Sequence, residues 1–306
     1  MAEVHNLISI KVAPKGMGLN DFVALEKGLF TDEGIQVEFD AQTFRGTQSS
    51  WKGMDYFERP QDKAVDDGVI QCACVWGTIS NASAGMGLIV PQCYGISPWA
   101  IFVRQDSNIE RPEDLKHVPI AVGMRAGSHF NVPYRLEHYM PLEDISTVNV
   151  GGFGARLRAL LDGQVEAASL LPPQIDMAKQ LGLREIIAGE FKTLWWVPNG
   201  APEAAVRGYL RALDRAERIL EADLPKYLPL WKHCIPSEFQ DYSWDFGSFT
   251  RGERFIYKPI EREEFDEVLA QVERWGLGQY LKDRSFEHLI YDSQGDDSSR
   301  TGRGAE

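Results

Sequence analysis

The chain has 306 residues, of which 43% are hydrophobic and 25% charged, a composition typical of a globular protein with one large or two ordinary cores. Its 45 acidic against 32 basic residues give a net charge of −13, which disfavours a nucleic-acid backbone or an anionic membrane surface as the main partner. No window holds about 18 uninterrupted apolar residues, so no membrane insertion is expected.

The first 103 residues predict strands separated by one clear helix. Leu7–Val12 and Ile35–Phe39 are strand candidates, and between them residues 20–29 carry an apolar stripe at helical spacing. Val69–Val75 is β-branched and apolar, as buried strands are. The sequence predicts a turn at Trp76–Asn81, then further strands at Leu88–Tyr94 and Pro98–Val103.

Residues 120–173 alternate between strand and helix patterns. Ile120–Val122, Thr147–Val150 and Val165–Leu171 are strand candidates, separated by segments with helical apolar spacing. This alternation pairs strands in parallel, and ligands of parallel sheets bind beyond the carboxyl ends of the strands, where helix N-termini also point. The turns at that edge supply candidate substrate contacts: Gly127, Ser128, Gly152 and Pro172.

The last third of the chain is mostly helical in pattern. Amphipathic helices are expected from Pro202 onward and at Glu263–Trp275. Between them Tyr242–Tyr257 is rich in aromatic residues and has the composition of an insertion. Residues 292–306 lack any apolar period and are predicted to be a disordered tail.

Several motifs occur in one order along the chain: ALEKGLFTDEGIQVEF, ERPEDLKHVPIAVG, GSHFNVPYRLE, VNVGG and ARLRALLDGQVEAASLLPP. Together they resemble the periplasmic-binding-protein-like superfamily, type II, over roughly residues 7–290. The most similar branch is the sulfonate-, nitrate- and thiamine-precursor-binding group, which contains solute-binding proteins and some cytosolic enzymes. The resemblance implies an α/β fold of two lobes, each a mainly parallel sheet flanked by helices, with a ligand cleft between them.

The resemblance also implies a division of the chain. Lobe I is expected to comprise residues 1–97 and 197–291, and lobe II residues 98–196. The chain would cross between the lobes at Pro98–Val103 and return at Thr193–Pro198. Paired strands through such a hinge let two lobes close around a ligand.

Two loops near the start are candidates for substrate contact, and the first of them, after the first strand, lines the ligand cleft in this superfamily. Lys15 could meet an anionic substrate group, although a solvated loop lysine is at least as good an interpretation. Asn20 or Asp21 can cap the following helix, and Asn20 is a further candidate contact. Thr43–Lys63, which contains Arg45, departs from the family pattern. It is either a lid or specificity loop over the cleft or an ordinary surface insertion.

The turn after the third strand offers further candidates by the same resemblance. Thr78 and Ser80 would supply hydroxyl donors to a ligand, and Trp76 a stacking surface. A core aromatic remains the alternative interpretation of Trp76.

His129 is the most interesting titratable residue, since it follows Gly127-Ser128 at a predicted helix N-terminus facing the cleft. It is a candidate acid or base, with a pKa that the helix end would lower, or a hydrogen-bonding ligand contact. Cys74 is a candidate nucleophile, although no local sequence identifies its base. Lys15 is the third candidate catalytic residue, beside His129 and Cys74.

The four cysteines are consistent with reduced, buried thiols, and no Cys or His pair has the spacing of a zinc site. No metal or cofactor is therefore expected. The superfamily includes a sulfinate desulfinase built around a cysteine in the loop after the first strand, but that loop has no cysteine here. It also includes a thiamine-pyrimidine synthase with a cysteine-rich motif, which the sequence CACVW resembles only weakly. Neither activity transfers residue by residue.

Two functions stay open. The first is a lyase, decarboxylase or hydrolase without a redox cofactor, acting on a small, aromatic or heterocyclic anion. The second is a non-catalytic solute-binding protein of an uptake system for sulfonate, nitrate, pyrimidine or a similar ligand. The N-terminal sequence MAEVHNLISIKVAP lacks the pattern of a secretory signal, so a cytoplasmic location is expected, which favours the enzyme. A homodimer is left open.

Overall fold

The computed structural model describes residues 7–14, 16–40, 65 and 67–291. Three of the sequence-based predictions lie outside the described residues: Lys15, the segment 43–63 with Arg45, and the tail 292–306. Among the described residues, no helix is long and apolar enough to cross a lipid bilayer.

Strands and helices alternate through most of the chain. The strands are β1 (Ile8–Ala13), β2 (Ile35–Phe39), β3 (Val69–Cys74), β4 (Leu88–Ile89), β5 (Tyr94–Val103), β6 (Pro119–Val122), β7 (Ser146–Asn149), β8 (Ala167–Leu170), β9 (Arg184–Val197) and β10 (Arg254–Ile256). The helices are α1 (Asn20–Glu26), α2 (Leu29–Asp32), α5 (Val75–Ser83), α6 (Gly127–Leu136), α7 (Phe153–Leu161), α8 (Gln174–Gln180), α9 (Glu203–Ala222), α10 (Leu224–Tyr227), α11 (Arg262–Arg274) and α12 (Phe286–Leu289). Short 3₁₀ turns are η1 (Pro112–Leu115), η2 (Leu142–Asp144), η3 (Leu228–His233), η4 (Ser237–Phe239) and η5 (Phe246–Ser248).

The strands form a sheet in the order β2-β1-β3-β9-β5-β8-β6-β7. Its two ends are parallel: β1 pairs with β2 and β3, and β6 pairs with β7 and β8. The centre is antiparallel, because the long strands β5 and β9 pair over nine residue positions, from Gly95–Thr193 to Val103–Arg184. The molecule thus has two mainly parallel halves joined by one long antiparallel pair.

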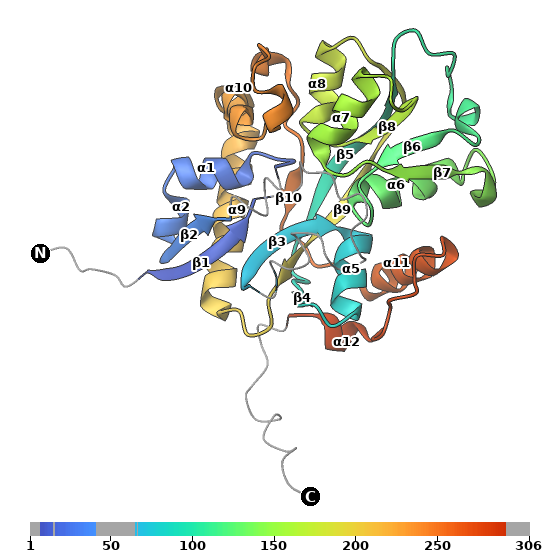
Figure 1. Cartoon of the computed structure of the whole chain (residues 1–306). Coiled ribbons are helices and arrows are strands. Elements are labelled where there is room, and N and C mark those ends of the chain that lie inside the picture. The colour runs from blue at the N-terminus through green and yellow to red at the C-terminus, as the bar shows by residue number, and fades with distance from the viewer. Residues whose placement is uncertain (1–6, 15, 41–64, 66, 292–306) are drawn as a thin grey trace, which may run out of the picture.

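Figure 1 shows these halves on opposite sides, with β5 and β9 running between them. We call the half built on β1–β3 lobe I and the half built on β6–β8 lobe II. This is the predicted architecture of two α/β lobes, and both strands of the predicted crossings are present, although the returning strand β9 is longer than expected. The residue boundaries of the lobes stay a prediction.

Buried apolar side chains hold each lobe together. In lobe II the central strands are almost wholly apolar, and Phe102, Ile120 and Leu170 are fully buried. In lobe I the 20-residue helix α9 buries one face, including Tyr209 and Leu213, against α1 and α2. Its other face is charged, as expected for an amphipathic helix on a sheet.

The aromatic stretch near the C-terminus connects the lobes. Arg158 of α7 donates through Nη2 to the carbonyl of Glu238 at 3.0 Å, and its guanidinium lies 4.6 Å from the ring centre of Phe239. Gln180 of α8 donates to the hydroxyl of Ser248 at 2.9 Å. The segment η4–η5 therefore packs on lobe II, and the sequence alone gave no sign of these contacts.

Two elements differ from the sequence-based prediction. The predicted turn at Trp76–Asn81 is part of helix α5, which begins where the N–H of Gly77 donates to Sγ of Cys74 at 3.3 Å. The predicted strand Leu88–Tyr94 is interrupted, since β4 ends before Pro91 and β5 begins after it. Proline has no N–H to offer a sheet partner, which explains the break.

Candidate functional site

The carboxyl ends of the parallel strands in the two lobes meet at one place. Helix α5 follows β3 in lobe I, and α6 follows β6 in lobe II. A Cβ atom on Gly127 would lie 3.4 Å from Cβ of Cys74, and one on Gly77 would lie 3.2 Å from the carbonyl oxygen of Arg125. Two glycines thus allow the helix N-termini to approach closely. We call this contact the helix junction.

Arg125 lies at the helix junction in an uncommon backbone conformation. Its φ angle is +60°, which non-glycine residues seldom adopt, and its side chain is 3% exposed. The guanidinium donates through Nη2 to Oδ1 of Asn81 on α5. A buried cation in strained backbone, bridging two lobes, is the kind of feature that clusters at binding sites.

His129 lies in the first turn of α6 with its ring orientation fixed. The N–H of Arg125 donates to Nδ1 of His129 at 3.2 Å. In the neutral imidazole the proton therefore resides on Nε2, which makes Nε2 a donor. The side chain is 7% exposed, and its ring centre lies 5.7 Å from that of Phe130.

Ser128 supports the turn before α6 through its buried hydroxyl. The N–H of Gly123 donates to Oγ of Ser128 at 2.9 Å, and the carbonyl of Ser128 accepts from the hydroxyl of Ser169 at 2.9 Å. Trp99 donates to the same Ser169 hydroxyl at 2.6 Å. These bonds fix the end of β6 to β5 and β8, so Ser128 positions the site.

Cys74 closes the lobe I side of the helix junction. It is 4% exposed, and its sulfur accepts the N–H of Gly77 as the N-cap of α5. Backbone N–H groups at a helix N-terminus stabilise negative charge on sulfur. Cys74 and His129 thus belong to neighbouring helix ends, one from each lobe.

Trp76 lies in an aromatic cluster inside helix α5. Its indole stacks on Phe130 and Phe191, with ring centres 6.1 and 6.2 Å apart, and donates to Oε1 of Gln271 at 2.6 Å. With Tyr134 it borders a hollow of about 210 Å³ over β5 and β9. This environment agrees with the core-aromatic interpretation of Trp76.

Thr78 and Ser80 are buried in the same helix. The hydroxyl of Thr78 donates to the carbonyl of Leu194 at 3.5 Å, and that of Ser80 donates to the carbonyl of Trp76 at 2.6 Å. Both hydroxyls therefore stabilise α5 and its contact with β9 in this structure.

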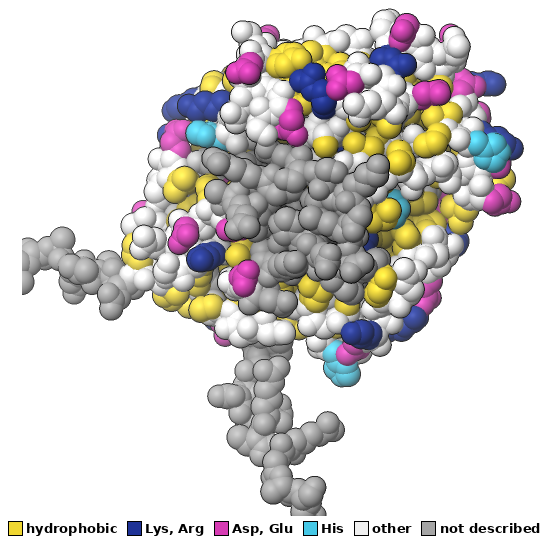
Figure 2. Space-filling model, in the orientation of Figure 1, with side chains coloured by type: hydrophobic (Ala, Val, Ile, Leu, Met, Phe, Trp, Pro, Cys, Tyr) yellow, Lys and Arg dark blue, Asp and Glu magenta, His cyan; other side chains and the backbone are white. Residues whose placement is uncertain are grey.

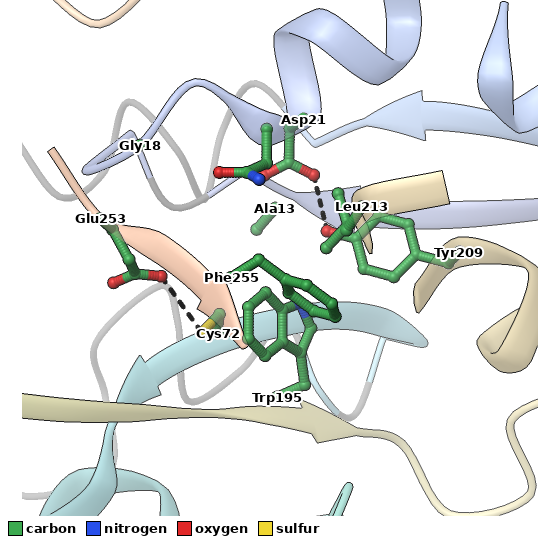
Figure 3. A pocket seen from close by; sticks show the side chains of 10 residues that line it. Ala13, Gly18, Asp21, Cys72, Trp195, Tyr209, Leu213, Glu253 and Phe255 are labelled. Atoms are coloured by element: carbon green, nitrogen blue, oxygen red, sulfur yellow. Dashed lines mark hydrogen bonds between the residues drawn. The ribbon is translucent and has the colours of Figure 1, made fainter. Parts of the chain in front are cut away.

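Asn20 lies beside a small cavity at the carboxyl end of β1. Its amide donates to Oε2 of Glu217 at 2.8 Å. The cavity, about 20 Å³, has space for about one water molecule. Figure 3 shows two polar pairs on its walls: the hydroxyl of Tyr209 donates to Asp21 at 2.6 Å, and the thiol of Cys72 lies 4.0 Å from Glu253. Burial, followed by the charge of Asp21, raises the pKa of Tyr209, so its hydroxyl stays protonated and donates to Asp21.

Gly152 and Pro172 mark the helix ends of lobe II. Gly152 precedes α7 after β7, and Pro172 precedes α8 after β8, where it forms a cis peptide bond with Pro173. Both are buried at the carboxyl edge that the sequence predicted for them.

Sequence reasoning missed Arg125, Arg156 and Gln174, which are buried polar residues at this edge. For Arg125 a signal existed: an arginine between two glycines, directly after a predicted strand. Within the described ranges, no three His, Cys, Asp or Glu side chains are arranged to hold a metal ion.

Figure 2 shows the face of the molecule that Figure 1 presents to the viewer. Basic and acidic side chains are interspersed around it, and apolar side chains gather on the side of lobe II. No large patch of one charge is visible on this face.

Neither a family model nor a curated protein sequence matches the chain. Solved structures do. The periplasmic aliphatic sulphonate binding protein SsuA from Escherichia coli has a TM-score of 0.68 at 14% identity, covering 92% of this chain and 97% of that one. The alkanesulfonate-binding protein SsuA from Xanthomonas axonopodis pv. citri, bound to MOPS, has a TM-score of 0.66 at 14% identity, covering 92% and 98%.

An enzyme is also among the similar structures. The desulfurization enzyme DSZB has a TM-score of 0.59 at 14% identity, covering 92% of this chain and 96% of that one. These likenesses confirm the predicted fold, that of two-lobed periplasmic binding proteins.

Proposed function

From this two-lobed binding-protein fold, we propose that the protein binds a small organic anion at the helix junction. The observation that carries the proposal is the meeting of α5 and α6, one from each lobe, with Arg125 and His129 between them. Binding proteins with such a hinge close their lobes on a ligand. The similar structures include proteins described as sulfonate-binding, which supports a ligand of this class.

The chemistry of the helix junction supports a negatively charged ligand. Two helix N-termini meet here, and the positive ends of their dipoles favour a negative charge. Arg125 adds a guanidinium, and Nε2 of His129 adds a donor.

A thermal-shift screen with aromatic carboxylates, sulfonates and pyrimidines tests the binding proposal. A ligand at a hundredfold excess over Kd stabilises the fold by about 2.7 kcal/mol. The response should be lost in His129→Ala and kept in His138→Ala, which changes an exposed histidine just beyond the end of α6. If both variants keep the thermal-shift response, the ligand binds elsewhere.

Catalysis is a second candidate function, supported by Cys74 and His129 at facing helix ends. A thiol at the N-terminus of one helix and an imidazole with one fixed tautomer at the N-terminus of another could act as a nucleophile and an acid or base. The protein would then be a lyase, decarboxylase or hydrolase without a redox cofactor. Incubation of any ligand found in the screen, followed by mass spectrometry, decides between the two. Turnover that disappears in Cys74→Ser, with binding kept, supports the enzyme, and a ligand returned unchanged supports a solute-binding protein.

A cytoplasmic location and a homodimer remain proposals. Cell fractionation tests the first, since a solute-binding protein of an uptake system would be found outside the cytoplasm. Light scattering of the purified protein tests the second.

A further inference from the structure

Arg156 of α7 is a fully buried cation that lacks a charged partner. Its side chain is 0% exposed. Nη1 donates to the carbonyl of Gly151 at 2.9 Å, and the guanidinium lies 5.4 Å from the ring centre of Phe153. Among the described residues, no acceptor lies within hydrogen-bonding distance of its Nε and Nη2.

Gln174 is a second buried polar side chain in need of partners. It is the first residue of α8, it is 0% exposed, and neither Nε2 nor Oε1 has a hydrogen-bond partner within the described part of the chain. Buried polar groups in native proteins are almost always hydrogen-bonded, because leaving one unpaired costs free energy. Two such side chains on adjacent helices therefore point to a missing binding partner.

The position of Arg156 relates it to the helix junction. The N–H groups of Val150 and Gly151 donate to the carbonyl of Val122 at the end of β6, at 2.9 and 3.3 Å. The N–H of Gly123, the residue after Val122, donates to the hydroxyl of Ser128 in the first turn of α6. The guanidinium, held by Gly151, is thus one strand away from α6 at the same carboxyl edge.

We propose that Arg156, with Gln174, receives the oxyanion of the ligand, a carboxylate, sulfonate or sulfinate. The inference rests on the proposed function and names the group that recognises the ligand's charge. Nε–H and Nη2–H point to the same side of a guanidinium and form a fork that fits two oxygen atoms. In Arg156 this side of the guanidinium is the unpaired one.

The charged groups on neighbouring elements do not neutralise Arg156. Glu238 of η4 lies against the first turn of α7, where a Cβ on Gly154 would be 2.5 Å from its Oε2. On α8, Asp176 accepts from Thr250, and Lys179 pairs with Glu185. Burial alone lowers the pKa of Arg156 to about 9. The site therefore holds a positive charge near neutral pH without an internal counter-ion.

The variant Arg156→Met tests the proposal, with Arg158→Met as matched control. Arg158 is on the same helix but pairs with Asp162 and with the carbonyl of Glu238. The probes are benzoate, benzenesulfonate, neutral benzamide and inorganic sulfate. We expect the wild-type protein to bind the anions, Arg156→Met to weaken this binding by roughly 10- to 100-fold, and Arg158→Met to leave it unchanged.

The ligand-free variants give an independent readout. Removal of an uncompensated buried charge should raise the melting temperature of Arg156→Met, whereas loss of the surface contacts should lower that of Arg158→Met. A lower melting temperature in Arg156→Met with unchanged anion affinity would show a structural arginine and overturn the proposal. So would a wild-type protein that responds to none of the anions. Should Arg156→Met not fold, Arg156→Lys keeps the charge without the fork, and it should still weaken anion binding.

The same data separate this inference from the proposed function. If benzamide and benzoate bind equally, lose affinity in His129→Ala and keep it in Arg156→Met, the helix junction binds a ligand and the anion subsite is wrong. If anion affinity falls in Arg156→Met and not in His129→Ala, the anion subsite is supported and the helix junction is not the binding site.

Discussion

The backbone N–H of Arg125 donates to Nδ1 of His129 across 3.2 Å, although Arg125 has a left-handed backbone. The bond joins the turn after β6 to the first turn of α6 and sets which imidazole nitrogen carries the proton. The side chain of the same arginine reaches Asn81 in the other lobe. One strained residue thus orients the histidine and links the two helix ends.

Replacement of His129 should affect stability through this bond. His129→Leu leaves the Arg125 N–H buried and unpaired, and should lower the free energy of unfolding by about 1–3 kcal/mol. His129→Asn, whose Oδ1 can accept the same N–H, should lose less. Urea unfolding measures both, and the exposed His138→Leu should stay within about 0.5 kcal/mol of the wild type. Equal losses in His129→Leu and His129→Asn would mean that packing, not this bond, is the cause.

Gly77→Ala should destabilise the protein although it lies in a helix. Alanine ordinarily stabilises a helix interior by about 1 kcal/mol relative to glycine. Here the added Cβ would lie 3.0 Å from Sγ of Cys74 and 3.2 Å from the carbonyl of Arg125, and such overpacking costs about 1–3 kcal/mol. Chemical denaturation gives the sign directly. A stabilised Gly77→Ala protein would show that α5 and α6 are not in close contact.

Glu217 should prove important for the stability of lobe I. This buried carboxylate of α9 accepts from Asn20, from Arg251 and from the N–H of Phe255. Glu217→Leu leaves the guanidinium of Arg251 without this partner, and should lower the free energy of unfolding by about 3–5 kcal/mol. The control is Glu221→Leu, an exposed position one turn further along α9, where a change within about 0.5 kcal/mol is expected. A similar small change in Glu217→Leu would refute the role given to these bonds.

The stability difference between Arg156→Met and the wild type should depend on pH. Burial lowers the pKa of Arg156 well below its usual range, to about 9. Below pH 9 the folded protein contains the buried charge, so its full destabilising effect is present. As the pH rises above 9 towards the usual range of a solvated guanidinium, the unfolded chain binds more protons than the folded one, and the wild type gains stability relative to the variant. Denaturation at pH 7.5 and pH 10, as rough limits of this window, should show the advantage of Arg156→Met shrinking; a constant difference would mean that Arg156 keeps its proton over this range.

The fold was largely predictable because its signals are local. Strand and helix patterns in residues 120–173 predicted parallel pairing, and hence the edge at which Gly127, Gly152 and Pro172 lie. Helix α5 was missed, because small polar residues such as Thr78 and Ser80 resemble a turn in sequence and become helical only when buried against β9.

The polar residues of the site were harder to predict. The partner of Arg125 is 44 positions away, and the missing partner of Arg156 is recognisable only when its surroundings are known. The sequence shows which residues are charged, but not whether their side chains are solvated or buried. Arg156 and Arg158 are two residues apart on one helix, yet only the first is fully buried.

A crystal structure with benzoate or benzenesulfonate bound is the most direct test of ligand binding between the lobes. We predict a ligand in contact with both the Cys74–Asn81 segment and the Arg125–His129 segment, with its oxyanion on Nε and Nη2 of Arg156. A ligand that touches one lobe alone, or occupies the hollow beside Tyr134 and Gln271, would contradict this account.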